Sequence, residues 1–277
     1  MTDSLKTDRV QLTTDPQGIA RLRLNRPEKH NAFDDAMIAD ISACLTQFHG
    51  TTDARVLILE SAGRSFSAGG DLAWMQRMAD YDFADNLEDA RGLATMLQLL
   101  KTLPVPSIAR IQGSAFGGAI GLICCCDIAV SLTGAKFGLT EARIGLVPAT
   151  IGPHVVEALG PRWARRLFIT AERFGAVQAR DIGLVHELAE DEEMLDTRIE
   201  QLAAELMLNS PQAMREGKQL VRELHGRPLD AELIEHTSAL IARLRVSDEG
   251  QEGLQAFLGK RPPRWTETTT PGEGKHV

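Results

Sequence analysis

Apolar and polar side chains alternate along the first part of the chain. Residues 9–14 and 19–24 each alternate with a period of two, which is typical of a half-buried strand. Between them lie Asp15, Pro16 and Gly18, residue types that favour tight turns. The two segments are therefore predicted to form a β-hairpin.

Helix and strand patterns then take turns as far as about residue 190. Asp34 is a candidate N-cap, and apolar residues follow it at helical spacing as far as Phe48. Short apolar runs typical of buried strands occupy residues 56–59, 107–111, 128–131 and 184–188. Two more helices are expected over residues 85–102 and 118–126. This alternation predicts an α/β fold with parallel strands and crossover helices.

A different pattern begins near Glu190. Four helices with short breaks are predicted over residues 192–209, 211–224, 228–245 and 248–258. We therefore divide the chain into a core (residues 1–190), a helical region (191–262) and a disordered tail (263–277). The helical region is expected to pack on the sheet or on a neighbouring subunit.

The composition is that of a folded, acidic protein. Of the 277 residues, 43% are hydrophobic and 25% are charged, and the net charge is −8. A protein that coats nucleic acid is expected to be basic, so we expect no nucleic-acid partner. The most apolar stretch, residues 115–126, is well short of the ~20 residues that span a bilayer, so we expect no membrane partner and a cytoplasmic location.

No metal site is expected. Three of the four cysteines, Cys124 to Cys126, are consecutive, and consecutive residues of a helix point about 100° apart. Their spacing matches no metal motif, and the seven histidines lack the H-x-x-x-H spacing. All four cysteines, with Cys44 as the fourth, are expected to be buried and reduced.

Three glycine-containing loops could bring the backbone close to a ligand. They cover residues 65–71, 113–118 and 138–145. The second loop opens a predicted helix, whose first turn has unpaired N–H groups and a partial positive charge. One of these amides, with a second from the loop at Ala68, could form an oxyanion hole for a carbonyl oxygen. Tight turns and close helix–strand packing would explain the same glycines.

Glu141 in the third loop is the candidate acid or base. It lies among apolar and small residues between Phe137 and Ile144. A carboxyl group in an apolar pocket has a raised pKa and can exchange protons near neutral pH. An exposed loop glutamate, or one paired with Arg143, is the alternative. The sequence contains no G-x-S-x-G elbow and no P-loop, which argues against a serine hydrolase and a nucleotide triphosphatase.

Three motifs in register resemble those of one family. Residues 24–32 are similar to an L-N-R-P-x-x-x-N-A opening, residues 65–72 to F-C-A-G-x-D-L with serine for cysteine, and residues 112–118 to G-x-A-x-G-G. From about residue 9 to 265 the chain resembles the crotonase family of enoyl-CoA hydratases and isomerases. The resemblance implies a crotonase (ClpP-like) fold of repeated ββα units with a helical C-terminal trimerisation region. It also implies a homotrimer or a homohexamer.

The same resemblance implies roles for individual residues. The amides of Ala68 and Gly118 would form the oxyanion hole for an acyl-CoA thioester, and Glu141 would transfer the proton. Coenzyme A is part of the substrate, and no other cofactor is expected. Further contacts with the substrate or its CoA moiety are expected from Arg26, Lys29, Ala32, Ser67, Gly69, Gly70, Asp71, Leu72, Gly117, Gly121 and Lys260.

The sequence departs from the family at one catalytic position. Hydratases of the family use two glutamates, and the second falls at Gly121 here. One interpretation is a hydratase in which another residue, water or the substrate replaces that group. Residues 71–75, 115–122, 125–127, 141–151 and 170–174 are similar to bacterial 3-methylglutaconyl-CoA hydratases, whose relatives act on isohexenylglutaconyl-CoA in terpene breakdown. The distal carboxylate of such a substrate is then expected to dock near Gly121.

Two other interpretations stay open. Isomerases of the family need one glutamate, so Glu141 alone could move a proton between C2 and C4 of a 3-enoyl-CoA. Some relatives bind RNA without catalysis, which the acidic charge of this chain disfavours.

Overall fold

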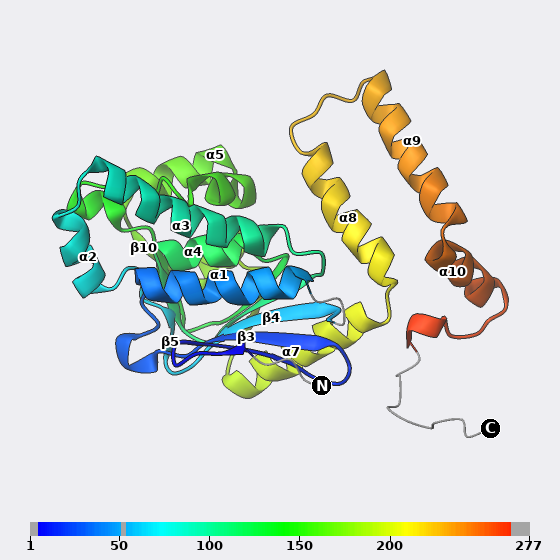
Figure 1. The fold of residues 1–277 in the computed structure, drawn as a ribbon, viewed down its shortest axis with the longest axis horizontal. Helices are drawn as coiled ribbons and strands as arrows, with labels where there is room; N and C mark the ends of the chain where they lie inside the picture. The colour runs from blue at the N-terminus through cyan, green and yellow to red at the C-terminus, as the bar shows by residue number, and fades with distance from the viewer. Residues whose placement is uncertain (1–4, 51–53, 267–277) are drawn as a thin grey trace.

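The strands form two sheets of unequal size (Figure 1). The structure, a computed structural model, describes residues 5–50 and 54–266. In spatial order the larger sheet contains β1 (Leu5–Lys6), β2 (Val10–Thr14), β3 (Ile19–Leu24), β4 (Val56–Ser61), β6 (Ser107–Ile111), β8 (Ile128–Leu132) and β11 (Glu187–Ala189). The smaller sheet contains β10 (Arg173–Gly175), β9 (Lys136–Gly138), β7 (Ser114–Phe116) and β5 (Ser65–Ser67).

Strand pairing follows the predicted alternation of strands and helices. The hairpin is confirmed, because β2 and β3 pair antiparallel with Val10 opposite Leu24. From β3 onward, β4, β6, β8 and β11 add in parallel. Parallel neighbours need crossover connections, and helices supply them, so the α/β class is confirmed. The smaller sheet was not predicted, because strands of three residues carry too little periodicity to be recognised.

Helices of the core lie mainly above the larger sheet in Figure 1. They are α1 (Asp35–Gly50), α2 (Leu72–Ala79), α3 (Phe83–Lys101), α4 (Gly118–Cys125), α5 (Gly152–Thr170) and α6 (Ala176–Asp181), with the 3-10 turns η1 (Pro27–Lys29) and η2 (Glu141–Ile144). The predicted cap of α1 is confirmed: the amide of Met37 donates to Oδ1 of Asp34 at 2.8 Å. The prediction missed α5, whose periodicity is interrupted by Gly160 (φ 74°) and Pro161.

The larger sheet separates two hydrophobic clusters. Along β4, Leu57 and Leu59 join the cluster under α1, α3 and α4, whereas Val56 and Ile58 join the cluster that α7 covers. Alternate residues of a strand face opposite sides, so a strand buried on both faces must be apolar throughout. This is why the run 56–59 was recognisable as a strand.

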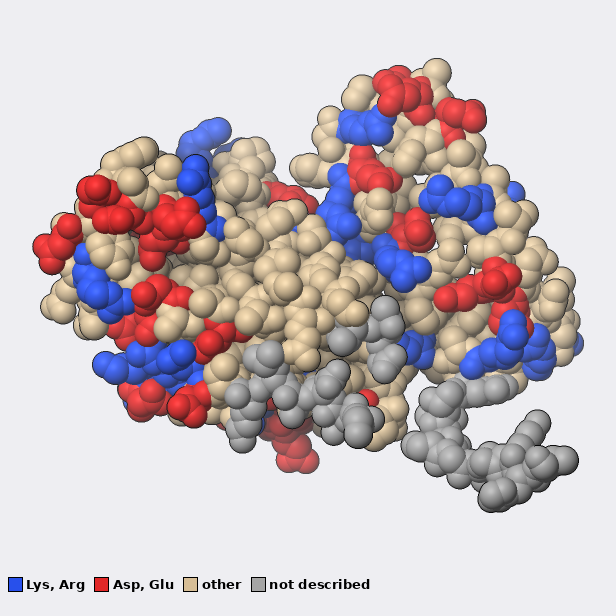
Figure 2. Space-filling model, viewed as in Figure 1, with Lys and Arg blue, Asp and Glu red and all other residues tan. Residues whose placement is uncertain are grey.

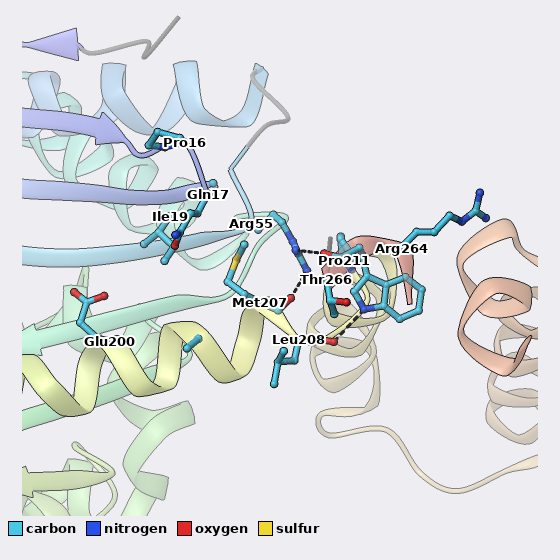
Figure 3. A pocket seen from close by; sticks show the side chains of 13 residues that line it. Pro16, Gln17, Ile19, Arg55, Glu200, Met207, Leu208, Pro211, Arg264 and Thr266 are labelled. Atoms are coloured by element: carbon cyan, nitrogen blue, oxygen red, sulfur yellow. Dashed lines mark hydrogen bonds between the residues drawn. The ribbon is translucent and has the colours of Figure 1, made fainter. Parts of the chain in front are cut away.

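The helical region consists of α7 (Glu192–Met207), α8 (Pro211–Leu224), α9 (Ala231–Val246) and α10 (Asp248–Leu258). Helix α7 packs on the sheet, as predicted, and α8 to α10 extend away from the core (Figure 1). A cavity of about 810 Å³ lies at this junction (Figure 3). Beside it, the Arg55 guanidinium donates to the carbonyls of Met207 (3.0 Å), Asn209 (2.8 Å) and Trp265 (2.7 Å).

The expected disordered tail is corrected at its start. Residues Arg264–Thr266 form the 3-10 turn η3, which is held because the Trp265 indole N–H donates to the Leu208 carbonyl at 3.0 Å. Residues 267–277 lie outside the described residues. Within the part of the chain that the structure describes, no helix is long and apolar enough to cross a membrane.

The cysteines are free and buried, as predicted. Burial raises the pKa of Cys44 to about 11 and of Cys124 to about 12, so both stay thiols at neutral pH. In residues 5–50 and 54–266 no three His, Cys, Asp or Glu side chains gather as metal ligands.

Candidate active site

The three glycine-containing loops leave one edge of the smaller sheet together. Strands β5, β7 and β9 are adjacent and parallel, and each leads directly into one loop. The carboxyl ends of parallel strands meet at the same edge, where ligands bind in α/β proteins. Topology therefore brings Gly70, Gly118 and Glu141 to one place, although they are far apart in the sequence.

Close approaches confirm that the loops converge. A Cβ at Gly69 would lie 3.0 Å from the carbonyl oxygen of Phe116, so the first two loops touch through their backbones. A Cβ at Gly117 would lie 3.3 Å from Oε1 of Glu141 and 3.9 Å from Cα of Gly69. Both glycines have positive φ, 89° and 54°, which other residues rarely adopt. The glycines are thus required both for the turns and for the contact.

Two amides in these loops are free to donate. Gly118 is the first residue of α4, and its N–H has no acceptor among the described residues. The N–H of Gly70 likewise has none in the described parts of the chain. The expected donor Ala68 is corrected, since its N–H already donates to the carbonyl of His30 at 2.9 Å. A carbonyl oxygen bound here would therefore accept from Gly70 and Gly118.

Phe33 connects the two donors. Its N–H donates to the carbonyl of Gly69 and its carbonyl accepts from the N–H of Asp71, both at 2.7 Å, so the peptide of Gly70 is held on both sides. Its ring lies 3.4 Å from the position of a Cβ at Gly118. The buried side chain of Phe33 thus fixes one loop by backbone bonds and packs against the other.

The side chain of Glu141 is partly exposed to solvent, and its surroundings disfavour the charged form of the carboxyl. It is half-buried, Oε2 is buried without a hydrogen-bond partner, and Arg143 forms no ion pair with it. Burial raises the pKa of Glu141, an effect only partly opposed by a backbone hydrogen bond. A carboxyl with one buried, unpartnered oxygen and a raised pKa is a candidate to hold and release a proton.

The space expected beside Gly121 is filled. A Cβ at Gly121 would lie only 2.5 Å from Cγ2 of Ile151 and 3.3 Å from Cδ2 of Leu97. Both neighbours are buried, and Gly121 itself is buried within α4. The expectation that a substrate carboxylate docks near Gly121 is therefore wrong, since apolar side chains occupy that place and would leave a charge unpaired.

Arg26 is already paired in the folded chain. Its guanidinium contacts Asp34 at 2.6 Å and Asp71 at 3.3 Å, and it donates to the carbonyl of Ala32 at 3.3 Å. Burial disfavours the charge of Asp71, but the amides of Trp74 and Ala73 and the cations Arg26 and Lys29 outweigh burial and lower its pKa. Arg26 is thus an internal tie of this loop, whereas Lys29 is exposed and free to meet phosphate.

The other expected contact residues occupy varied positions. Ser67 is buried and its hydroxyl accepts from the Gly69 amide at 3.3 Å, while Leu72 opens α2 and is largely exposed. Lys260 follows α10, at the opposite end of the molecule from α2 (Figure 1). It does not reach this site within one chain.

Two residues that shape the site escaped the sequence analysis. Gly70 was named only as a contact, because the sequence does not show that His30 occupies the amide of Ala68. Ile151 was not singled out, since nothing local indicates that it packs against Gly121. The glycine itself was the available signal, because a glycine inside a helix often marks a close approach.

Comparisons with known proteins agree on one family. The family model for enoyl-CoA hydratase/isomerase matches residues 14–268. An enoyl-CoA hydratase structure from Shewanella pealeana is 43% identical, covers 93% of this chain and 96% of its own, and superposes with a TM-score of 0.89. Pseudomonas aeruginosa AtuE is 32% identical, with coverages of 94% and 100% and a TM-score of 0.89.

One relative is named for the reaction that it catalyses. The 2,3-dehydroadipyl-CoA hydratase of Escherichia coli is 31% identical over 248 residues, which cover 89% of this chain and 94% of the relative. The matching family model, the shared fold and the convergence of the three loops lead to the same conclusion. This chain belongs to the enoyl-CoA hydratase/isomerase family and is an enzyme of the hydratase type that acts on acyl-CoA.

Proposed function

We propose that the enzyme adds water across the 2,3 double bond of an enoyl-CoA with a distal carboxylate, such as 3-methylglutaconyl-CoA or its isohexenyl relative. The resemblance of residues 141–151 to hydratases of that substrate supports this choice. The name of the Escherichia coli relative also denotes a dicarboxylic acyl group. The observation that carries the proposal is the carboxyl of Glu141, with its buried and unpartnered Oε2, beside the loops that hold two free amides.

The two amides would act on the thioester carbonyl. As a water oxygen bonds to C3, the electron pair of the double bond moves toward C2 and the carbonyl oxygen becomes negative. The N–H groups of Gly70 and Gly118 would stabilise this enolate oxygen. Protonated Glu141 then gives its proton to C2, and the carbonyl re-forms.

The proton of the attacking water needs a second acceptor. Ile151 and Leu97 fill the place beside Gly121, so this part of the chain offers no carboxylate. We propose that the distal carboxylate of the substrate takes this proton and later releases it to solvent, while Glu141 regains one from solvent. One carboxyl from the protein and one from the substrate then balance the reaction.

Turnover of three substrates tests the proposal. We expect 3-methylglutaconyl-CoA to be hydrated at least about 100-fold more efficiently than crotonyl-CoA, since one general-base step contributes 10²–10⁴-fold. The monomethyl ester of 3-methylglutaconyl-CoA keeps the shape and loses the charge, so it should react as slowly as crotonyl-CoA. Equal efficiency for all three substrates would contradict the proposal.

A specific observation favours a second candidate, an isomerase. With Ile151 beside Gly121, Glu141 is the carboxyl available to shuttle a proton between C2 and C4 of a 3-enoyl-CoA. Incubation with a 3-enoyl-CoA in heavy water separates the two functions. Addition of solvent across the double bond indicates a hydratase, and a shifted double bond without addition indicates an isomerase.

We also propose that copies of the chain associate as a trimer or as a hexamer of two trimers. Ile234, Ile241 and Val246 on α9 and Leu254, Phe257 and Leu258 on α10 are exposed apolar side chains. Association would cover them and could bring Lys260 to the CoA of a neighbouring subunit. Sedimentation velocity should show three or six chains for the wild type and smaller species for Phe257→Asp. A monomeric wild type would contradict this assembly.

A further inference from the structure

The side chain of Trp74 packs against the loop that contains the Gly70 amide. Its indole ring is buried, and Cε3 lies 3.8 Å from the position of a Cβ at Gly70. The indole N–H points away from this contact and donates to Oδ1 of Asp89, on α3, at 3.0 Å. A side chain that touches the loop is therefore held by a carboxylate from another helix.

Phe33 orients the Gly70 amide from one side, because its N–H donates to the carbonyl of the same peptide, and α2 begins on the other side. Asp71 caps the helix, its Oδ1 accepting from the amides of Ala73 at 2.8 Å and Trp74 at 3.3 Å. Trp74 thus belongs to the first turn, joined by the cap to the residue that follows Gly70. A rotation of this turn would displace Asp71 and strain the bonds by which Phe33 holds the Gly70 amide, so a fixed first turn keeps the free N–H in place.

Besides Trp74, helix α2 contacts the core through the half-buried side chain of Met78. It is eight residues long, and Trp74 is its one buried residue. Leu72 is 77% exposed, and the ion pair of Arg77 with Asp35 at 2.6 Å joins two side chains that are about half exposed. Exposed pairs stabilise little. Buried Trp74, bonded to Asp89, and half-buried Met78 are therefore the main contacts between this helix and the rest of the core.

The surroundings of Asp89 disfavour its negative charge, so this carboxylate costs stability. Burial raises its pKa, as does nearby Asp35, while the bond from Trp74 and the charge of Arg77 oppose this. A cavity of about 490 Å³ beside it is also lined by Asp35, Tyr81, Asp85 and Glu88. Figure 2 shows acidic side chains gathered over α2 and α3. An apolar residue would avoid this repulsion but could not accept from the indole.

We propose that Asp89 is a positioning residue for the oxyanion hole, acting through Trp74 to hold the first turn of α2 and the Gly70 amide in place. This rests on the proposed function, in which Gly70 donates to the thioester oxygen. Asp89 touches no substrate atom in this account. Its contribution is the fixed direction of one donor.

Four variants test the proposal. Asp89→Ala removes the acceptor, Trp74→Phe removes the donor but keeps an aromatic ring, and Asp89→Asn keeps an acceptor oxygen without the charge. Glu88→Ala is the matched control, because it removes an exposed acid from the same helix. The readouts are kcat and KM with 3-methylglutaconyl-CoA, and the infrared carbonyl stretch of bound 3-methylglutaryl-CoA labelled with ¹³C at the thioester.

We expect Asp89→Ala and Trp74→Phe to lower kcat about 10–100-fold, the effect of losing one hydrogen bond to a charged group. KM should stay within about twofold, and the downshift of the carbonyl stretch should shrink, because a misdirected donor polarises the carbonyl less. Asp89→Asn should restore kcat to within about threefold of the wild type, and Glu88→Ala should match the wild type.

The proposal is overturned if Asp89→Ala and Trp74→Phe keep both the wild-type kcat and the wild-type carbonyl shift. It is also overturned if Asp89→Asn is as impaired as Asp89→Ala, since loss of charge would then explain the effect. Trp74→Phe decides the question if Asp89→Ala does not fold. Failure of the proposed function is distinguishable, because the wild type itself would then show no downshift on binding the thioester.

Discussion

The loop after β9 and the first turns of α4 lie side by side, yet they treat a carboxyl group in opposite ways. In the loop, Glu141 keeps a buried oxygen without a partner. In the helix, Gly121 gives up its side chain, and Ile151 packs into the space at 2.5 Å from where a Cβ would be. A buried, unpartnered oxygen at Glu141 costs stability, whereas Gly121 has no polar side chain and avoids that cost.

The difference separates a position suited to catalysis from a position that stabilises the fold. A buried polar group without a hydrogen bond destabilises the fold, so an unpartnered carboxyl is retained where it has a function. Close apolar packing does the reverse and stabilises the fold. Glu141 is therefore the candidate for the reacting position, whereas Gly121 and Ile151 are part of the core.

The largest effect is expected from Glu141→Gln. A neutral amide cannot exchange the proton, so kcat should fall about 10²–10⁴-fold while the fold is unchanged. Steady-state kinetics and circular dichroism measure both. Near-normal turnover would show that Glu141 has no catalytic role. The contrast between a catalytic Glu141 and a packed Gly121 would then no longer hold.

Removal of an oxyanion donor should come next. Gly118→Pro deletes the N–H at the first position of α4, where proline is tolerated, and should lower kcat about 10²–10³-fold. Gly118→Ala is the control, because it keeps the N–H and its Cβ would lie 3.4 Å from the Phe33 ring. An unchanged carbonyl stretch of the bound thioester in Gly118→Pro would clear this amide of the role.

One substitution should disrupt the packing of Ile151 against Gly121, and a second should partly restore it. Gly121→Glu should destabilise the fold by about 1–3 kcal/mol or more, because the new side chain meets Ile151. Gly121→Glu with Ile151→Gly should recover part of that loss and gain activity on crotonyl-CoA. Gly134→Glu, where nothing lies within 4 Å of a Cβ, should be tolerated. Thermal unfolding and crotonyl-CoA assays decide, and a well-tolerated single Gly121→Glu would contradict the packing argument.

The pH dependence follows from the raised pKa of Glu141. Hydration begins with the protonated acid, so kcat/KM should fall about tenfold for each pH unit above that pKa. Isomerisation begins with the ionised base, and its rate would instead fall as the pH drops below it. A rate profile between pH 5 and 9 gives the sign, and Glu141→Gln should flatten it.

The smallest effect concerns stability. Because folding raises the pKa of Glu141 above its ordinary value of 4.5, its favourable contribution is present below that value and is lost as the pH rises through the folded pKa. Glu141→Gln should therefore match the wild type at pH 4 and exceed its Tm at pH 8. A lower Tm at pH 8 would contradict the unpartnered state of this carboxyl.

The parts of the fold that could be predicted are those with enough length to carry a period. The hairpin, α1 and the buried strands were recognisable, because their apolar residues repeat along a single element. The smaller sheet was not, since its pairing joins segments as distant as Ser67 and Ala115. Yet this sheet aligns the loops of the site.

The site shows the same limit. Glu141 could be named as a candidate from local sequence, because a carboxyl among apolar residues has direct physical meaning, whereas the amide of Gly118 was named through the family resemblance. Gly70 could not be distinguished from Ala68, since the choice depends on which amide the His30 carbonyl occupies. The filling of the space beside Gly121 by Ile151 is likewise a contact between distant elements.

In the proposed hydration, Glu141 is the one carboxyl of the protein that transfers a proton. Turnover of 3-methylglutaconyl-CoA in H₂¹⁸O, compared between the wild type and Glu141→Gln, tests it most directly. We expect the wild type to form a product carrying ¹⁸O at C3 and the variant to form it at least about 100-fold more slowly. An unlabelled product, or equal labelling rates in both proteins, would contradict it.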